Sequence, residues 1–123
     1  MTLYELKKFN AMRAETAALR RRHIEVIEEL ETCENEAYRE DLNRLNETLN
    51  RRIKKNIQQE IRITEEIAEI TDAQIRTSIF MHYFDGYSWN DVADAIGGGN
   101  TDVSCKVYFN RWLRRNKCNE RML

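Results

Sequence analysis

The chain has 123 residues, contains no proline, and carries a charge on a third of its residues, with a formal net charge of −1. No stretch approaches the roughly 18 consecutive apolar residues of a membrane span, and the acid-containing start MTLYELKKF is unlike a signal peptide. We therefore expect a cytoplasmic protein with no membrane partner.

The N-terminal region, residues 1–70, has a composition typical of helices. It contains no glycine or proline and is rich in Glu, Arg, Lys, Leu and Ile, and we predict an all-α fold. Apolar residues recur at heptad spacing over 12–37, where Thr16 and His23 interrupt them, and continue over 38–70 mostly in steps of four. Such a drifting stripe predicts a helix that packs in a bundle or in an irregular coiled coil.

A helix of this length cannot bury its apolar stripe alone and needs a partner helix. The region forms either one unbroken helix or a hairpin whose break lies near residues 31–36, the most polar part of the stripe. We favour the hairpin, because two helices of about thirty residues can then pack within one chain. In both cases we expect these helices to form a homodimer.

The pattern of helix caps and apolar residues over 71–117 predicts three short helices. Thr71 or Asp72 caps the first helix, which runs to about Phe84. Ser88 is a natural N-cap for the second helix, in which apolar residues fall at i, i+3, i+4 and i+7. The buried faces that we predict are Ile75, Ile79, Phe80 and Tyr83 in the first helix, and Trp89, Val92, Ala93 and Ile96 in the second.

The third helix follows the glycines at 97–99 and runs to about Arg115. Two settings of this helix are open. Val103 and Val107 face the core in the first setting, but that stripe becomes polar after two turns. In the second setting the stripe stays apolar along the whole helix. In either setting we expect Trp89 to lie between the first and third helices. We adopt the second setting, with its inward residues Cys105, Phe109 and Trp112.

Positive charge gathers on the third helix and the tail behind it. Residues 103–123 carry six Lys and Arg side chains against one acid, whereas residues 71–102 carry five acids against Arg76. A surface that binds phosphate needs such a local excess of positive charge.

Two short helices joined by a glycine-bearing turn form a helix-turn-helix, whose second helix normally lies in the DNA major groove. The stretch YFDGYSWNDVADAIGGGNTDVSCKVYFNRWL resembles the helix-turn-helix of sigma-factor region 4. It is more similar still to small prophage and mobile-element proteins of Gram-positive bacteria that carry such a C-terminal half. The resemblance covers the chain from about residue 71 onward, and it implies DNA binding and transcription control. Its matching features are Tyr83, Gly86, Ser88, Trp89, Val92, Ala93, Gly97 through Thr101, Ser104, Lys106, Asn110, Arg111, Trp112 and Leu113.

The adopted setting leaves one face of the third helix for DNA. Ser104, Lys106 and Asn110 are suited to hydrogen-bond base edges, and an exposed valine suits a thymine methyl group. Asn100 and Thr101 lie at the helix N-terminus, where phosphate binds, and the later basic side chains would contact the DNA backbone. The predicted DNA-binding residues are Asn100, Thr101, Val103, Ser104, Lys106, Val107, Asn110, Arg111, Arg114, Arg115 and Lys117.

We therefore predict a helical oligomerisation region at 1–70, a helix-turn-helix at 71–117 and a tail at 118–123, which act together as a phage-type transcriptional regulator. A symmetric dimer would place two recognition helices, each about Thr101–Arg115, one DNA turn apart on a near-palindromic site. Two alternatives stay open. One is a DNA-packaging component like a small terminase subunit, and the other is a module that docks on RNA polymerase without touching DNA.

The sequence shows no signature of an enzyme. Nucleophile–base pairs, paired carboxylates and phosphate loops are missing at recognisable spacing. The three cysteines form no CxxC pair, which argues against a disulfide framework or a zinc site. We expect no catalytic residues, no metal and no cofactor.

Overall fold

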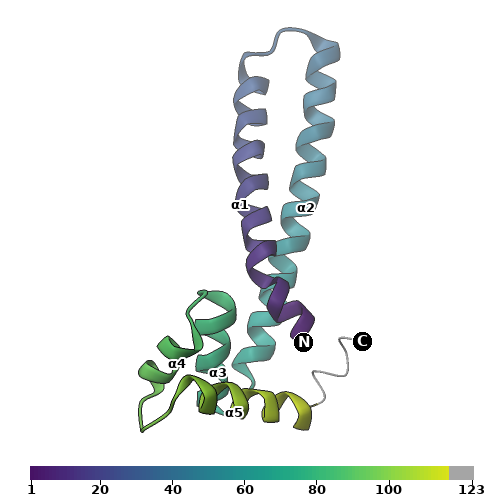
Figure 1. Ribbon diagram of the computed structural model, residues 1–123. Helices are drawn as coiled ribbons and strands as arrows, with labels where there is room; N and C mark the ends of the chain where they lie inside the picture. The colour runs from purple at the N-terminus through teal and green to yellow at the C-terminus, as the bar shows by residue number, and fades with distance from the viewer. Residues whose placement is uncertain (117–123) are drawn as a thin grey trace. The chain divides into compact units, whose positions relative to one another are not determined.

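A computed structural model describes residues 1–116, and over these residues the chain is all-helical, with no strand (Figure 1). The all-α prediction is therefore confirmed, while Lys117 and the tail 118–123 lie outside the described residues. None of the described helices is long and apolar enough to cross a membrane. The elements are α1 (Leu3–Thr32), α2 (Glu36–Ala68), α3 (Ala73–Ser78), the π-helical segment η1 (Ile79–Phe84), α4 (Trp89–Ile96) and α5 (Asp102–Arg115).

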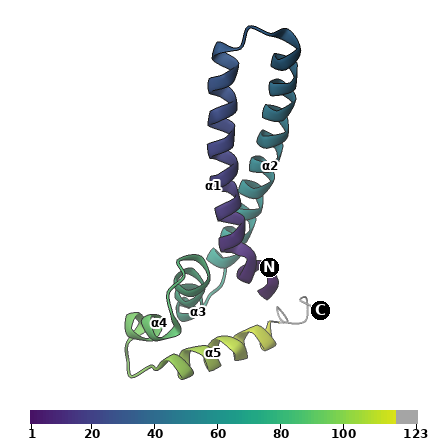
Figure 2. The same cartoon turned by 45° about the horizontal axis from the view of Figure 1, so that its top comes forward.

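The chain divides into two compact units. One unit is Ala11–Ile61, in which α1 and α2 run antiparallel as a helical hairpin, as Figure 2 shows. The other unit combines Met1–Asn10 with the described part of the chain from Arg62 to residue 116. In this unit the first turns of α1 and the last turns of α2 group with α3, η1, α4 and α5.

The hairpin breaks at residues 33–35, within the predicted stretch. Asn35 caps α2, since its side-chain oxygen accepts a hydrogen bond of 3.0 Å from the N–H three residues on. Arg39 reaches back and donates to the carbonyl oxygens of Leu30 (2.8 Å) and Cys33 (3.1 Å) at the end of α1. A polar cap and an arginine thus end one helix and begin the next without glycine or proline.

The interior of the hairpin contains an apolar cluster. Val26 of α1 is fully buried and belongs to one cluster with Leu42 and Leu49 of α2. The buried Thr16, which interrupts the heptad pattern, is accommodated because its hydroxyl donates to the Met12 carbonyl oxygen at 3.0 Å. The polar interruption therefore keeps a hydrogen-bond partner and does not end the helix.

The second unit has an apolar core to which α1, α2, α3 and η1 contribute. Two ionic contacts accompany it: the Met1 amino group lies 2.7 Å from the Glu66 carboxylate, and Arg62 pairs with Glu5. These contacts join the start of α1 to the end of α2. The most deeply buried residues of this core are Leu6, Phe9, Ile63, Ile67, Ile75 and Ile79.

The predicted single helix from residue 71 or 72 to about Phe84 is instead two elements, α3 and η1. Asp72 caps α3 by accepting hydrogen bonds from the N–H groups of Gln74 and Ile75. In η1 the Asp85 N–H bonds to the Phe80 carbonyl oxygen at 2.9 Å, a five-residue step that widens the helix. The wider turn leaves the Phe84 ring stacked on Phe9, with 3.7 Å between ring centroids.

Candidate nucleic-acid interface

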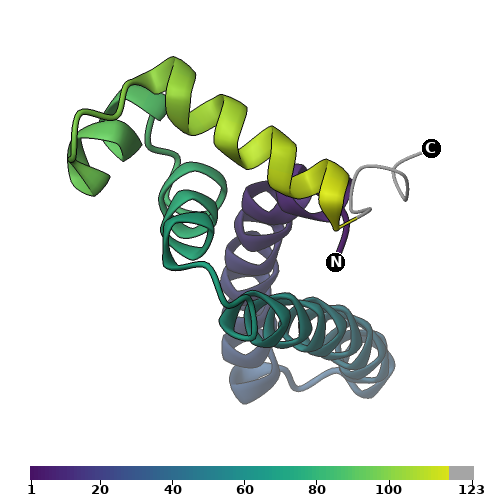
Figure 3. The same cartoon turned by 90° about the horizontal axis from the view of Figure 1, so that it is seen from below.

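The turn between α4 and α5 is built by glycines. Ser88 caps α4, since its hydroxyl oxygen accepts a hydrogen bond from the Asp91 N–H at 3.1 Å. Gly97 ends the helix with φ 71° and ψ −153°, a conformation that is essentially restricted to glycine. Gly98 and Gly99 also have positive φ. The chain reverses over these residues and enters α5, which Figure 3 shows running past α3 and η1 toward the first turns of α1.

The buried face of α5 is the one that the second setting predicts. Cys105, Phe109, Trp112 and Leu113 are all buried, whereas Val103 is 65% exposed. Burial also raises the pKa of the Cys105 thiol, as expected of a small core residue. One side of α5 is therefore fixed against the core, and the opposite side is left to solvent.

An aromatic cluster holds α5 in this orientation. The Phe109 ring centroid lies 5.4 Å from that of Tyr83, 5.6 Å from that of Trp89 and 6.1 Å from that of Trp112. Trp89 also contacts Tyr83, with 6.4 Å between centroids. Trp89 thus lies between η1 and α5, as predicted, and desolvation in this cluster raises the pKa of Tyr83 to about 12.

The polar residues at the start of α5 make a local cap. Thr101 Oγ1 accepts from the Ser104 N–H at 3.1 Å, and Ser104 Oγ accepts from the Thr101 N–H at 2.8 Å. The Asn100 amide donates to the Gly97 carbonyl oxygen at 2.7 Å. Three of the predicted DNA-binding side chains are therefore engaged in the turn, and a base contact through Ser104 would compete with the cap.

The predicted basic residues within residues 1–116 lie on the exposed side of α5. Lys106, Arg111, Arg114 and Arg115 are all exposed, and none forms an ion pair with an acid of the described residues. The three arginines and Tyr108 line a hollow of about 320 Å³. Positive charge is therefore available along the second half of α5, where no carboxylate of residues 1–116 forms an ion pair with it.

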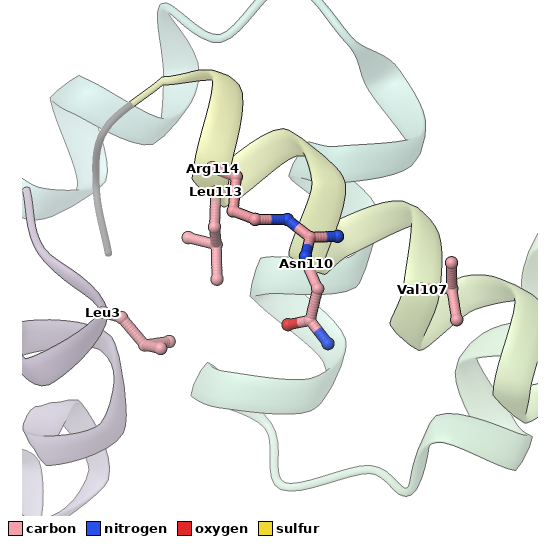
Figure 4. Close-up of a pocket in the computed structure, with 5 residues that line it drawn as sticks. All are labelled: Leu3, Val107, Asn110, Leu113 and Arg114. Carbon is pink, nitrogen blue, oxygen red and sulfur yellow. The ribbon is translucent and has the colours of Figure 1, made fainter. Parts of the chain in front are cut away.

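A second hollow, of about 250 Å³, flanks the same helix (Figure 4). Val107, Asn110 and Arg114 line it together with the buried Leu113, and Leu3 at the start of α1 completes it. A duplex that contacts these three exposed residues must therefore also pass close to Leu3. The sequence patterns gave no reason to place Leu3 here, because it precedes the long apolar stripe.

A hydrogen bond between Tyr108 and Asp72 ties α5 to the start of α3. Asp72 thus serves both as the cap of α3 and as the acceptor for the Tyr108 hydroxyl. This hydrogen bond, helped by the N–H groups of Ile75 and Gln74 and by the charge of Arg115, lowers the pKa of Asp72 against an opposing effect of burial. The same bond raises the pKa of Tyr108.

Replacing Tyr108 with phenylalanine is expected to lower the free energy of unfolding by about 1 kcal/mol at neutral pH. Because the pKa of Asp72 is lower in the folded state, its contribution is present above the usual aspartate pKa and is lost as pH falls through the folded value. Tyr108→Phe should therefore reduce the loss of stability on acidification, measured by urea unfolding from about pH 7 to about pH 3. The matched control is Tyr87→Phe, at an exposed tyrosine. Equal effects of the two substitutions would show that the Tyr108 bond contributes nothing specific.

Among residues 1–116, no group of three or more His, Cys, Asp or Glu side chains is placed to hold a metal ion. Comparison of the chain with protein-family models, with curated proteins and with solved structures finds no match.

Proposed function

We propose that this chain binds double-stranded DNA through α5 and acts as a phage- or prophage-type transcriptional regulator, with α3–η1, α4 and α5 as a helix-turn-helix of the sigma-region-4 kind. One observation carries the proposal. The helix that follows the glycine turn is fixed by aromatic packing on one side, and on the other it displays basic side chains that form no ion pair with an acid of residues 1–116. The resemblance of residues 83–113 to sigma-factor region 4 supports the same function.

The dimensions of α5 suit a major groove. Its 14 residues make a helix about 21 Å long, and a groove about 12 Å wide admits one helix. Val103 and Lys106 lie on the exposed side of its first half, where recognition helices usually contact base edges. Arg111 and Arg115 lie further along and are suited to phosphate contacts.

The N-terminus of α5 supplies a further phosphate contact in this proposal. Because Thr101 and Ser104 use their side chains for the capping box, the contact is assigned to backbone N–H groups at the start of α5. Asn100 and Thr101 then act by holding the turn in shape. This assignment keeps the predicted location of the contact but changes the groups that make it.

A second candidate function rests on the acids of α4. Asp91 and Asp94 are exposed and would be repelled by a DNA backbone, so DNA must approach from the α5 side. The same acids would suit a module that docks on a basic surface of RNA polymerase without DNA contact. The two functions differ in whether α5 or α4 is the contact surface.

The first test is binding of the full chain to a fluorescent random-sequence duplex, followed by anisotropy over a series of salt concentrations. We expect binding that weakens with salt, with a slope of about −0.9 in log K against log salt for each phosphate contacted. Four contacts from α5 would give a slope of about −3.6. No binding at low salt would refute the proposal and favour docking on RNA polymerase.

A further inference from the structure

Helix α1 has apolar side chains on two different sides. Val26 is fully buried in the interior of the hairpin. Ile24 and Ile27 are 55% and 38% exposed. Helix α1 already packs against α2 on the side of Val26. The exposure of two neighbouring isoleucines elsewhere on the same helix therefore needs an explanation.

The exposed isoleucines belong to a second stripe, which we call the outer stripe of α1: Arg20, Ile24, Ile27 and Glu31. The steps of four, three and four residues place these side chains in one row along the helix. All four are exposed. Within residues 1–116, neither Arg20 nor Glu31 forms an ion pair.

The charges along this part of α1 are separated by sign. Arg20, Arg21 and Arg22 precede the isoleucines, whereas Glu25, Glu28, Glu29 and Glu31 accompany or follow them. Of these, Arg22 and Glu25 pair with each other at 3.0 Å within the helix. The remaining basic charges near the isoleucines lie on one side of them along α1, and the remaining acids lie on the other.

We propose that a second copy of this chain packs along the outer stripe of α1 in the antiparallel direction. Such packing sets Ile24 against Ile27 of the partner subunit and Arg20 against Glu31 of the partner subunit. Both pairs are centred on the same point, between Glu25 and Val26, so a two-fold axis through that point generates each of them twice. Arg21 and Glu28 flank the stripe. In the same antiparallel packing, Arg21 faces Glu28 of the partner subunit, and this pair is centred close to the same point.

The charge pattern also fixes the direction of packing. A parallel pair would place Arg20 beside Arg20 of the partner subunit and Glu31 beside Glu31 of the partner subunit, and like charges across an interface are destabilising. The antiparallel pair converts both repulsions into attractions and brings the four isoleucine side chains together at the centre. A surface that is complementary to itself in this way fits another copy of the same chain better than an unrelated protein. The proposal does not rest on DNA binding.

The oligomeric state of the full chain in solution, measured by sedimentation equilibrium, tests this proposal. We expect the wild-type chain to be a dimer. Ile24→Gln/Ile27→Gln removes the apolar centre and should raise the dimer dissociation constant about a hundredfold or more. Both isoleucines are exposed on the hairpin of a single chain, so their replacement should not disturb the packing of α1 against α2. The helix content of the resulting monomer should therefore stay close to that of the wild-type chain, and its thermal unfolding should show that the hairpin still folds.

Charge reversal tests the direction. Arg20→Glu/Arg21→Glu should weaken the dimer about tenfold or more, because each reversed charge meets an acid across the two-fold axis. Adding Glu28→Arg/Glu31→Arg to the same chain exchanges both sets of charges and should restore the dimer. In a parallel dimer, neither result would be obtained, since each residue would face its own copy.

The matched control is Arg44→Glu/Arg51→Glu, which makes the same change in net charge on exposed residues of α2. This variant should dimerise like the wild type. The proposal is overturned by a wild-type chain that is monomeric at its highest soluble concentration. It is also overturned by a dimer, or by a ring of more subunits, that the Ile24 and Ile27 substitutions leave intact.

Discussion

Replacing Phe109 with alanine is expected to lower the free energy of unfolding by about 3–5 kcal/mol, the usual cost of removing a buried phenylalanine ring. Phe109 has no exposed surface, and its ring contacts Tyr83 of η1, Trp89 of α4 and Trp112 of α5. The substitution leaves a cavity where three elements meet. Urea unfolding at neutral pH measures the loss, and near-ultraviolet circular dichroism reports whether the aromatic cluster loses its fixed packing.

Tyr87→Ala is the matched control, because Tyr87 is an exposed aromatic residue close to the same helices in the sequence. We expect this control to change stability by no more than about 0.5 kcal/mol. Phe109→Leu should fall between the two, since leucine refills part of the cavity. If Phe109→Ala cost as little as Tyr87→Ala, the aromatic cluster would not be the core that holds α5.

The features that local pattern determines were predictable from the sequence. The stripe of Cys105, Phe109 and Trp112 indicated the buried face of α5 because apolar residues at helical spacing must lie on one side. Ser88 indicated the start of α4, and the glycines at 97–99 indicated its end. Each of these inferences needs only residues within a few positions of one another.

The features that the sequence did not reveal depend on distant residues. The π-helical segment η1 differs from the predicted continuous helix, and its Phe84 ring stacks on Phe9, which lies 75 positions earlier in the chain. Tyr108 and Asp72 are joined by a hydrogen bond between elements, although the sequence indicated Asp72 only as a possible helix cap. Leu3 lines a hollow beside α5 for the same reason. Periodicity reports which side of a helix is buried, but not which segment covers it.

The candidate site likewise has features that the sequence predicted and features that it did not. The exposure of Lys106, Arg111 and Arg115 followed from the choice of buried face. The engagement of Ser104 in the cap did not, because a serine at the third position of a helix can either cap or point outward. Contacts to bases therefore remain a prediction for the exposed residues of α5, and the basic side chains give the most direct way to test it.

Replacing Lys106, Arg111 and Arg115 together with alanine is expected to abolish most DNA affinity at physiological salt. Each phosphate contact that is lost should reduce the salt slope by about 0.9, so the triple variant should lose about 2.7 of the slope of the wild type if all three side chains contact phosphates. Arg111→Ala alone should weaken binding to a preferred site by about 1–3 kcal/mol if Arg111 contacts a base edge. Anisotropy with a random duplex gives the slope, and competition with a selected duplex gives the specific part.

The control for the triple variant removes the same number of positive charges elsewhere. Arg51, Lys54 and Lys55 are exposed on α2, in the other compact unit, and their replacement by alanine changes the net charge equally. This control should keep the wild-type slope if α5 is the contact surface, because it removes none of the side chains that contact phosphates in that case. An equal fall in both variants would show that binding follows net charge alone, whereas a fall confined to the α2 variant would move the interface from α5 to the hairpin.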